Sequence, residues 1–556
     1  MMNSPVVNRE ESSSASSEHS SLPEETHSNP LPIHSRYQIL FSSVHGEIEV
    51  ESFKRHSFFF VLYHFLGVFS FGLLYLINEW YPVLKVNIVC YRSILSEATH
   101  LIVTGEDSPP SVCDVIEEIV DHNFPNEYTI FPYSESNEYD DGADENLIVP
   151  SAGPSYRFIN YQLVKYVWKP ATLRFEELAT VSGSVKLADL ASRYRGFSAG
   201  QRHAWRQLYG PNKITIHVPS YFTLLWKEAI NFFYVFQVFS IALWCFDHYY
   251  LYAMAIFIIS CYSLSTTLMR TKREKIRLRD MVETNQDIVV DVLCNPDACD
   301  DTPQNMNVEN VAVESLVPGD VISLSSTGFF LPCDCVLISG TAIVNESMLT
   351  GESAPVTKSA VSVSSLSDEI FNSETHRTHT LYCGTELLQT RYYSKELVLA
   401  VVVSTGFNTS KGSLVRSIMF PRSFLFSFYR DSHRFIGFLF LIALCGMGYT
   451  FYLYARRGLA INRMIIRGLD LITIVVPPAL PAAQASGTDH ALERLKKQNI
   501  HCVSPNRICV AGKAKVVVFD KTGTLTEDSL EVYGVLGVED ANNLQKSALE
   551  TDVDRE

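Results

Sequence analysis

Hydrophobic residues in this chain occur in long runs that are separated by polar, alternating stretches. The first run extends from Ser57 to Tyr81 and carries no charge before Glu79. A run of this length crosses or enters a bilayer, and helices that are apolar on every side are rare in soluble proteins. Gly67 and Gly72 would also let the chain bend and return on the same side. We therefore predict a membrane segment that either spans or re-enters the bilayer.

Two further runs, Ile230 to Phe246 and Tyr249 to Met269, follow each other almost without a gap. Only Asp247 and His248 separate them, which predicts two antiparallel membrane spans joined by a tight turn. A basic cluster from Arg270 to Arg279 comes next. Lysine and arginine collect on the cytoplasmic side of membrane spans and also attract anionic lipid. Both properties place the end of the second span at the cytoplasmic surface.

A second pair of runs, Phe435 to Tyr454 and Leu469 to Ala485, predicts two more spans. The last run contains "DLITIVVPPALPAA", whose prolines remove helical N–H donors, so the helix must break. Carbonyls freed in this way are tolerated in a bilayer only where they line a cavity or a binding site. With a carboxylate one turn earlier, the break is a candidate cation site; a plain kink is the alternative. The candidate substrate-binding residues are Asp470, Thr473, Ile474, Pro477, Pro478, Ala479, Leu480 and Pro481.

Between the membrane runs the chain is polar and has the pattern of β-strands. Residues 83–215 contain alternating stretches such as "YRFINYQLVKYVW", and residues 287–420 are rich in β-branched side chains between turn signals. The two regions predict separate strand-rich domains. The first fifty residues begin with a Ser-, Glu- and Pro-rich tract that has too little apolar surface to offset its ordering entropy, which predicts a disordered tail.

Composition narrows the functional classes. The formal charge of -16 argues against nucleic-acid binding, which needs a basic face. Cys294, Cys299, Cys333 and Cys335 are spaced closely enough for a metal site, but neither pair has a second paired cluster. Ordinary buried or reduced thiols are the alternative.

The most specific stretch is "FDKTGTLT", Phe519 to Thr526, which follows "KVVV". This pattern predicts a buried parallel strand that ends in an aspartate, and open α/β sheets place their chemistry at such strand ends. A lysine, a glycine turn and several hydroxyl and amide donors follow the carboxylate. Such groups suit a carboxylate that becomes phosphorylated.

The stretch resembles the phosphorylation motif of the P-type ATPases, and three other stretches resemble the same family in the same order. "PGDVISL" (318–324) and "LTGES" (349–353) resemble the actuator domain, and the proline-broken run resembles the fourth membrane helix. "PPALP" and the flanks of the phosphorylation motif look most like the type V pumps of subgroup B. Subgroup A has glutamate where this chain has Ala479. Members of subgroup B move polyamines out of late endosomes and lysosomes.

The resemblance implies a multi-domain α-helical membrane protein with a cytosolic β-rich actuator domain and the start of a Rossmann-like α/β phosphorylation domain. The expected divisions are a tail (1–50), a membrane-dipping segment (51–82), a strand-rich cytosolic domain (83–215), two spans (216–270), the actuator domain (271–430), two more spans (431–490) and the start of the phosphorylation domain (491–556).

The resemblance also implies roles for single residues. Asp520 would take the γ-phosphate of ATP, Lys521 would neutralise charge, and Asp520 with the Thr522 carbonyl would hold Mg2+. Glu352 would orient the hydrolytic water, and Gly351 would allow close approach.

The transported species would be a polyamine by resemblance, although metal cations suit the same oxygen atoms. Other expected partners are membrane lipid and anionic lipid at the N-terminal region, without nucleic acid. The expected location is the late endosome or lysosome membrane.

One departure from the family is severe. The 556 residues contain no recognisable nucleotide-binding domain, so we expect them to form no phosphoenzyme in isolation. The sequence therefore fits part of a polyamine pump, part of a metal-cation pump, or a non-catalytic membrane protein that binds lipid or full-length pumps. Four apolar spans argue against a soluble phosphatase-like enzyme.

Overall fold

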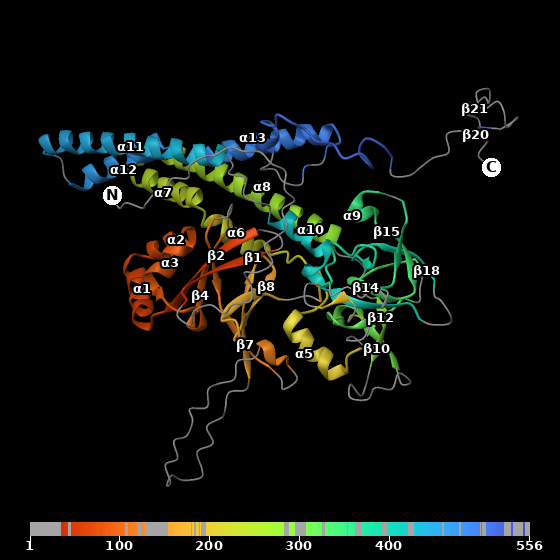
Figure 1. Ribbon diagram of the computed structural model, residues 1–556. Coiled ribbons are helices and arrows are strands. Elements are labelled where there is room, and N and C mark those ends of the chain that lie inside the picture. Colours follow the sequence, from red (N-terminus) through yellow and green to blue (C-terminus); the bar gives the residue numbers. More distant parts are fainter. Residues whose placement is uncertain are drawn as a thin grey trace, which may run out of the picture.

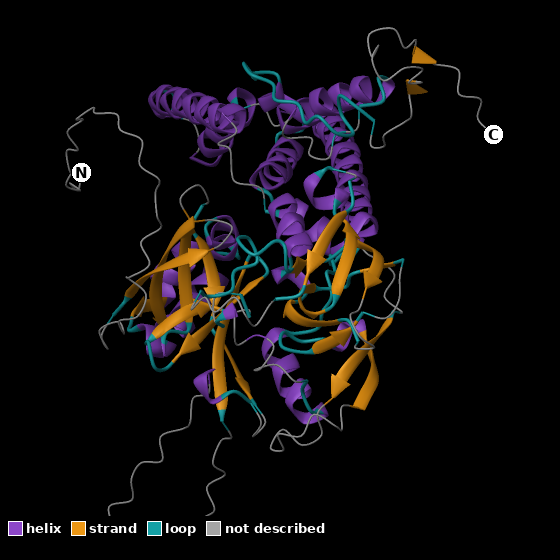
Figure 2. Cartoon of the chain, turned by 45° about the vertical axis from the view of Figure 1, so that its right-hand side comes forward, coloured by secondary structure: helices purple, strands orange, loops and turns teal. Residues whose placement is uncertain are grey.

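The chain folds into two strand-rich units that lie side by side, with the long helices gathered along one side of them (Figure 1 and Figure 2). The computed structural model describes residues 35–42, 46–105, 109–120, 124–128, 154–178, 181–182, 185–187, 190, 196–282, 288–294, 307–324, 328–352, 354–361, 369–391, 397–420, 427–458, 461–476, 480–500, 502, 508–527, 535–536 and 549–550.

The first unit is a pair of antiparallel sheets with one shared core. Its strands are β1 (Tyr37–Ser42), β2 (Gly46–Arg55), β3 (Cys90–Arg92), β4 (His100–Gly105), β5 (Ser111–Asp114), β6 (Ile116–Ile119), β7 (Ser155–Tyr161), β8 (Val164–Lys169) and β9 (Arg174–Glu177). One sheet has the order β1-β2-β4-β5, with β3 beside β2, and the other has the order β6-β7-β8-β9. Buried Ile48 and Leu101 of the first sheet pack with Tyr166 and Trp168 of the second.

The predicted disordered tail extends too far, because β1 and β2 begin before residue 50. Ile48 and Val50 are buried, whereas Glu47 and Glu49 are exposed, as expected of a strand with one face on a core. β2 pairs with β1 and also with β4, which lies about fifty residues later in the chain. This distant pairing is what orders the segment, and local composition does not reveal it.

The apolar run from Ser57 to Tyr81 forms a helical hairpin between β2 and β3. Helices α1 (Ser57–Phe69) and α2 (Leu73–Trp80) meet at a bend of 115°. Gly72 has a φ of 83°, so the bend uses the glycine freedom that the sequence predicted. Helix α3 (Pro82–Val89) then leads back to the sheet, where Val86 packs on Phe53. This geometry favours a segment that returns over one that crosses.

The second unit also contains two antiparallel sheets. Its strands are β10 (Val289–Cys294), β11 (Asn307–Ala312), β12 (Val321–Ser323), β13 (Phe329–Phe330), β14 (Asp334–Ser339), β15 (Thr341–Asn345), β16 (Val356–Ser359), β17 (Thr380–Leu381), β18 (Glu386–Arg391) and β19 (Leu399–Ser404). One sheet has the order β11-β10-β12-β19-β14-β17, and the other has the order β13-β18-β15-β16.

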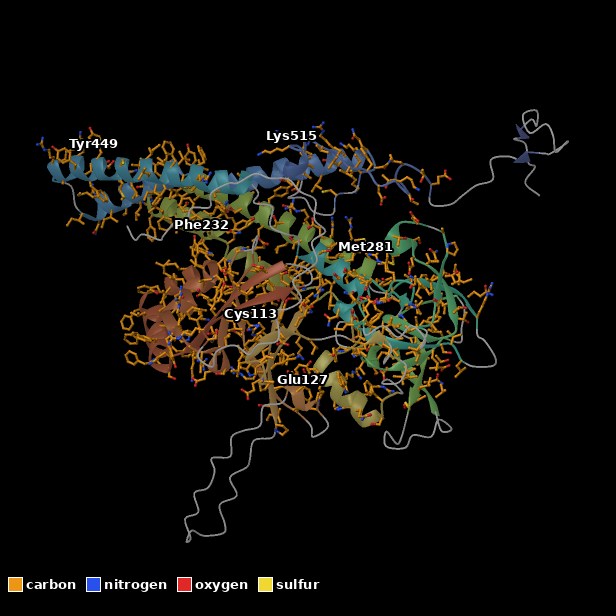
Figure 3. The ribbon with its side chains drawn as sticks, in the orientation of Figure 1. Cys113, Glu127, Phe232, Met281, Tyr449 and Lys515 are labelled. Carbon is orange, nitrogen blue, oxygen red and sulfur yellow. The ribbon has the colours of Figure 1, made fainter. Side chains whose placement is uncertain are left out.

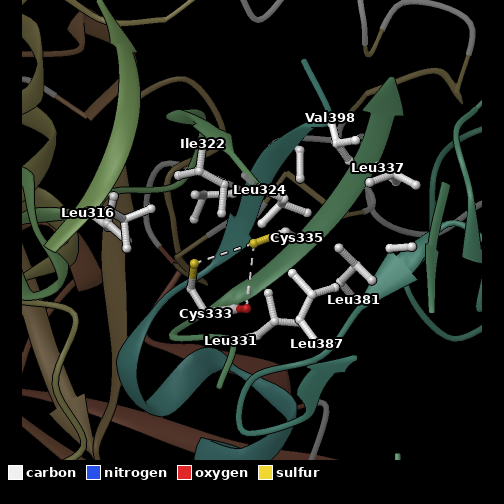
Figure 4. Packing of buried hydrophobic residues seen from close by; sticks show 14 of the residues in the cluster. Leu316, Ile322, Leu324, Leu331, Cys333, Cys335, Leu337, Leu381, Leu387 and Val398 are labelled. Atoms are coloured by element: carbon white, nitrogen blue, oxygen red, sulfur yellow. Dashed lines mark hydrogen bonds between the residues drawn. The ribbon is translucent and has the colours of Figure 1, made fainter. Parts of the chain in front are cut away.

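Cys333 and Cys335 belong to the core of this second unit (Figure 4). Both are fully buried among leucine, isoleucine and valine side chains, and their Sγ atoms lie 3.4 Å apart. They therefore pack as small hydrophobic residues. Cys299 lies outside the described residues.

Helix α5 (Ala199–Tyr209) connects the two strand-rich units. Its buried Arg202 donates Nε–H to Asp320 Oδ1 in the second unit at 3.1 Å. At the other end of the helix, Lys165 of β8 donates to the carbonyl oxygen of Leu208 at 2.9 Å. Burial lowers the pKa of Lys165 to about 8, although the charge of Glu118 opposes this shift.

The remaining helices are α6 (Tyr221–Ala229), α7 (Phe232–Phe246), α8 (Tyr250–Val282), α9 (Ser347–Thr350), α10 (Ser410–Met419), α11 (Ser427–Arg456), α12 (Ile461–Val475), α13 (Leu480–Lys497) and α14 (Ile508–Ala511). Among the described residues, α8 and most of α11 are each long and apolar enough to span a membrane. Two bent pairs, α1 with α2 and α6 with α7, pass the same test when each pair is counted together.

The helix of the second predicted span does not end at residue 270, because α8 continues unbroken to Val282. With 33 residues the helix is about 50 Å long, whereas the hydrocarbon core of a bilayer is about 30 Å thick. The basic cluster therefore forms a helical extension. Its end reaches the second unit, where Val282 packs with Val415 of α10 (Figure 3, beside the labelled Met281).

Helix α12 begins at Ile461, eight residues before the predicted span. Arg463 and Arg467 interrupt the hydrophobic run there, so the sequence hides the helix start. Gly468 lets α12 approach α11, because a Cβ at this position would lie 2.6 Å from the Phe451 ring. Close packing of α12 on α11 thus depends on the absence of a side chain at Gly468.

Asp334 joins three segments of the second unit at its buried carboxylate. It accepts hydrogen bonds from the backbone N–H of Cys383 at 2.7 Å and of Ser410 at 2.7 Å, and from the Ser410 hydroxyl at 3.0 Å. Burial raises the pKa of Asp334 from 3.8 to about 6, although these donors lower it.

This shift predicts a pH-dependent stability. Between about pH 4 and about pH 6 the folded chain keeps a proton that the unfolded chain has released, so stability falls as pH rises, by about 3 kcal/mol at most. We expect the Tm of the detergent-solubilised protein to fall across this range, and to fall less in Asp334→Asn, whose amide does not titrate. An equal pH dependence in both proteins would contradict the assignment.

Candidate functional site

The sequence "DKTGTLT" forms a compact turn at the surface. The backbone N–H groups of Leu525 and Thr526 donate to the carbonyl oxygen of Lys521 at 2.9 and 3.0 Å. Gly523 has a φ of 72°, which a side chain would disfavour. Asp520 is exposed at the start of the turn, and its Oδ1 accepts the N–H of Lys521 at 2.8 Å.

The strand predicted before this turn is not present in the described residues. Val516, Val517 and Val518 are 78%, 66% and 89% exposed, and they have no strand assignment. A parallel strand needs neighbours on both sides to satisfy its backbone and cover its side chains. Among the described strands, none pairs with this segment. The short β20 (Val535–Leu536) and β21 (Leu549–Glu550) pair only with each other.

The hydrolytic loop of the sequence prediction lies between β15 and β16. We use this name for residues 346–352, which contain α9 and end at Glu352. Gly351 ends α9 with a φ of 73°, the left-handed geometry that reverses a helix end. The N–H of Glu352 donates to Thr350 Oγ1 at 3.2 Å, and its side chain is exposed. Ser353 lies outside the described residues.

The structure brings the loop and the phosphorylation motif together, although 169 residues separate them in the sequence. A Cβ built on Gly351 would lie 3.6 Å from Asp520 Oδ2, and apart from its neighbours in the chain no other heavy atom of the described residues lies within 4 Å of it. The backbone of the loop therefore faces the carboxylate directly. Water has access to the contact, because both Asp520 and Glu352 are exposed.

The second predicted site lies on α12, where Asp470 is 5% exposed and Thr473 is fully buried. Thr473 Oγ1 accepts the indole N–H of Trp244 at 3.0 Å and donates to the carbonyl oxygen of Asp470 at 2.9 Å. Oδ1 of Asp470 is buried, and no described residue donates a hydrogen bond to it. Ile474 does not join this group, since it is 64% exposed.

Arg467 lies between two carboxylates near the same site. Its Nη1 is 2.7 Å from Asp247 Oδ2 and 3.7 Å from Asp470 Oδ2. One guanidinium facing two carboxylates leaves one negative charge, which favours a further cation. Arg467 and Trp244 are not among the residues that the sequence motifs indicate. Two features of the sequence could have indicated this group. Arg467 and Asp470 have i,i+3 spacing, and Asp247 lies in the two-residue turn between two apolar runs.

The helix is interrupted where the prolines predict it. α12 ends at Val475, and α13 begins at Leu480. Residues 477–479, which include Pro477, Pro478 and Ala479, lie outside the described residues, as do the side chains of Leu480 and Pro481.

Mg2+ usually keeps several waters and binds through one or two carboxylates together with substrate phosphates. Asp520 fits that requirement, because its carboxylate is exposed and only Oδ1 makes a hydrogen bond to protein within the described residues. The described residues contain no cluster of three or more His, Cys, Asp or Glu for a fully protein-bound metal. A metal at Asp520 would thus share its coordination with a phosphate.

Comparison with known proteins identifies the class. Residues 296–419 match the model of the P-type ATPase actuator domain, and these residues include the hydrolytic loop. Residues 45–169 match the model of the P5-type ATPase cation transporter. The second strand-rich unit is therefore an actuator domain, and the chain belongs to the P5-type ATPase family.

Individual relatives agree with this family. Human polyamine-transporting ATPase 13A3 is 40% identical over 503 residues, which cover 86% of this chain and 40% of the relative. Human polyamine-transporting ATPase 13A2 is 43% identical over 382 residues, or 68% of this chain and 31% of the relative. The probable cation-transporting ATPase 13A4 of Gallus gallus is 35% identical over 91% of this chain and 41% of the relative. The chain thus spans about two fifths of the length of the relatives it matches.

The contact between Gly351 and Asp520 predicts a specific cross-link. We expect the variant Gly351→Cys/Asp520→Cys to form an intramolecular disulfide under mild oxidation, because a Cβ at position 351 would lie 3.6 Å from the end of the Asp520 side chain. Peptide mass spectrometry would identify the linked pair, with each single-cysteine variant as control. Failure to form this pair, with both thiols accessible to alkylation, would contradict the contact.

Proposed function

We propose that this protein works as a P5-type pump that moves a cation across a membrane by ATP hydrolysis, through a phosphorylated Asp520. One observation carries the proposal: the Gly351 backbone of the actuator domain faces Asp520 Oδ2, with a Cβ position only 3.6 Å away. A hydrolytic loop has chemical reason to lie there only if this carboxylate carries a group to be removed.

In the first step, a carboxylate oxygen of Asp520 attacks the γ-phosphorus of ATP. The new O–P bond forms as the bond to the ADP oxygen breaks. Lys521, next to the carboxylate, would neutralise the charge that develops on the phosphoryl oxygens. Mg2+ held by Asp520 and the Thr522 carbonyl would supply further positive charge when bound.

In the second step, the Glu352 carboxylate would orient a water molecule and take its proton while the water oxygen attacks phosphorus. The bond between phosphorus and the Asp520 oxygen then breaks, which returns the free carboxylate. Gly351 supports this step because it places no side chain between the loop and the phosphoryl group. We propose that a Rossmann-like phosphorylation domain begins at the Asp520 turn and supplies the remaining surroundings.

Asp470 and the freed carbonyls of the α12 break would hold the cation. The excess negative charge around Arg467 supports a cationic substrate. Two of the relatives named above are called polyamine-transporting, and this supports a polyamine over a metal ion. We further propose export toward the cytosol from late endosomes or lysosomes, with membrane lipid around α8 and α11 and anionic lipid at the N-terminal hairpin.

Phosphorylation is the first test of this function. In membranes that contain the full-length protein, labelled ATP should give an acid-stable, hydroxylamine-sensitive phosphoprotein that is absent in Asp520→Asn. Glu352→Gln should form it but lose it at least about tenfold more slowly, because the attacking water lacks its base. Labelling that persists in Asp520→Asn would refute the assignment of the acceptor.

The cation site is tested by a matched pair of variants. Asp470→Asn should raise the polyamine concentration for half-maximal ATPase activity at least about tenfold, since it removes a buried charge from the site. Asp247→Asn removes the carboxylate nearer to Arg467 and should change that concentration less. Equal effects of the two variants would mean that both carboxylates serve only to hold Arg467.

A further inference from the structure

A fully buried ion pair lies at the base of the hydrolytic loop. Lys358 is 2% exposed and Glu346 is 5% exposed, and Lys358 Nζ lies 2.6 Å from Glu346 Oε1. Lys358 also donates to the carbonyl oxygen of Arg377 at 2.7 Å. Burying either charge alone would be costly, so each charge stabilises the other in this position. Among the described residues, Glu346 Oε1 makes this ion-pair contact but accepts no hydrogen bond.

The pair connects the start of the loop to β16. Glu346 is the first residue after β15, and Lys358 lies on β16, which pairs with β15 up to Val344 and Val356. The chain between these two strands lies outside the sheet and contains α9. Lys358 lies within the strand pairing, opposite Ala342, so the ion pair ties the start of the loop back onto β16. The Arg377 carbonyl links Lys358 to the body of the domain.

Glu346 binds Lys358 through its side chain, and its backbone is hydrogen-bonded to the rest of the loop. Its carbonyl oxygen accepts the N–H groups of Leu349 and Thr350 at 2.9 and 3.0 Å and the Thr350 hydroxyl at 3.1 Å. Thr350 Oγ1 in turn accepts the N–H of Glu352. A continuous series of contacts thus extends from Lys358 through Glu346 and Thr350 to Glu352.

Helix α9 has only 4 residues, and a single helical turn is unstable by itself in water. Its geometry must therefore come from contacts outside the turn. We propose that Lys358 and Glu346 are positioning residues, which act through the loop to hold Gly351 and Glu352 against Asp520 for the hydrolytic step. This inference rests on the function proposed above.

The test uses variants that separate position from folding. Glu346→Gln/Lys358→Met removes both charges at similar volume, which is tolerated far better than an unpaired buried charge. Lys358→Arg keeps the charge and serves as the conservative rescue. The control Glu97→Gln/Lys54→Met removes an exposed ion pair of the N-terminal unit, whose side chains are 54% and 37% exposed.

Two readouts are measured on the full-length protein. Hydrogen exchange at the amides of residues 349–352 should be at least about tenfold faster in the neutral double variant, with β14 and β19 unchanged. Phosphoenzyme should form to the normal level but decay at least about tenfold more slowly. Lys358→Arg, which keeps the positive charge, should keep both values within about threefold of the unchanged protein, and the control variant should alter neither.

Each outcome decides a separate point. Unchanged exchange in a folded double variant would overturn the claim that the pair holds the loop. Faster exchange with normal decay would overturn its role in hydrolysis. If the unchanged protein forms no phosphoenzyme, the proposed function is wrong. The proposed role of the ion pair in hydrolysis is then wrong as well. The exchange data would still decide whether the pair holds the loop. Lower phosphoenzyme formation with normal decay would indicate a purely structural role and would also overturn the proposal.

Discussion

The structure depends on a close approach between two segments. The hydrolytic loop of the actuator domain must reach the exposed carboxylate of Asp520 with no side chain between them. Gly351 meets that requirement in two ways. Its φ of 73° turns the chain at the end of α9, and the absence of a Cβ leaves Asp520 Oδ2 as its neighbour. The sheets beneath it serve this geometry, since β15 and β16 deliver the loop and the buried core fixes those strands.

Sequence motifs indicated the candidate residues because each motif is local. The positions of Gly351, Glu352 and Asp520 follow from short stretches, and the break of α12 follows from its prolines. The partners of these residues were not predictable in the same way. Glu346 and Lys358 are twelve residues apart and meet through a strand pairing, and Asp247 meets Arg467 across 220 residues. Such contacts depend on the register and packing of distant elements, which no single stretch of sequence specifies.

Hydrophobic runs identified apolar segments but not helix ends. A run stops at the first charged residues, whereas a helix stops where its backbone loses donors or packing partners. α8 therefore continues through its basic cluster to Val282, and α12 begins among arginines. The opposite error occurred at "KVVV", where a strand-like pattern stays exposed because the described residues supply no neighbouring strand.

The α7 and α8 hairpin links the two candidate sites by direct packing. α7 carries Trp244, which binds Thr473 beside Asp470, and its end carries Asp247, which binds Arg467. α8 continues from that turn as one unbroken helix whose end packs on α10 of the actuator domain. A continuous helix transmits displacement along its axis, because each of its backbone hydrogen bonds resists shortening. Movement of the actuator domain would thus reach the turn between α7 and α8, where Asp247 binds the Arg467 that lies beside Asp470.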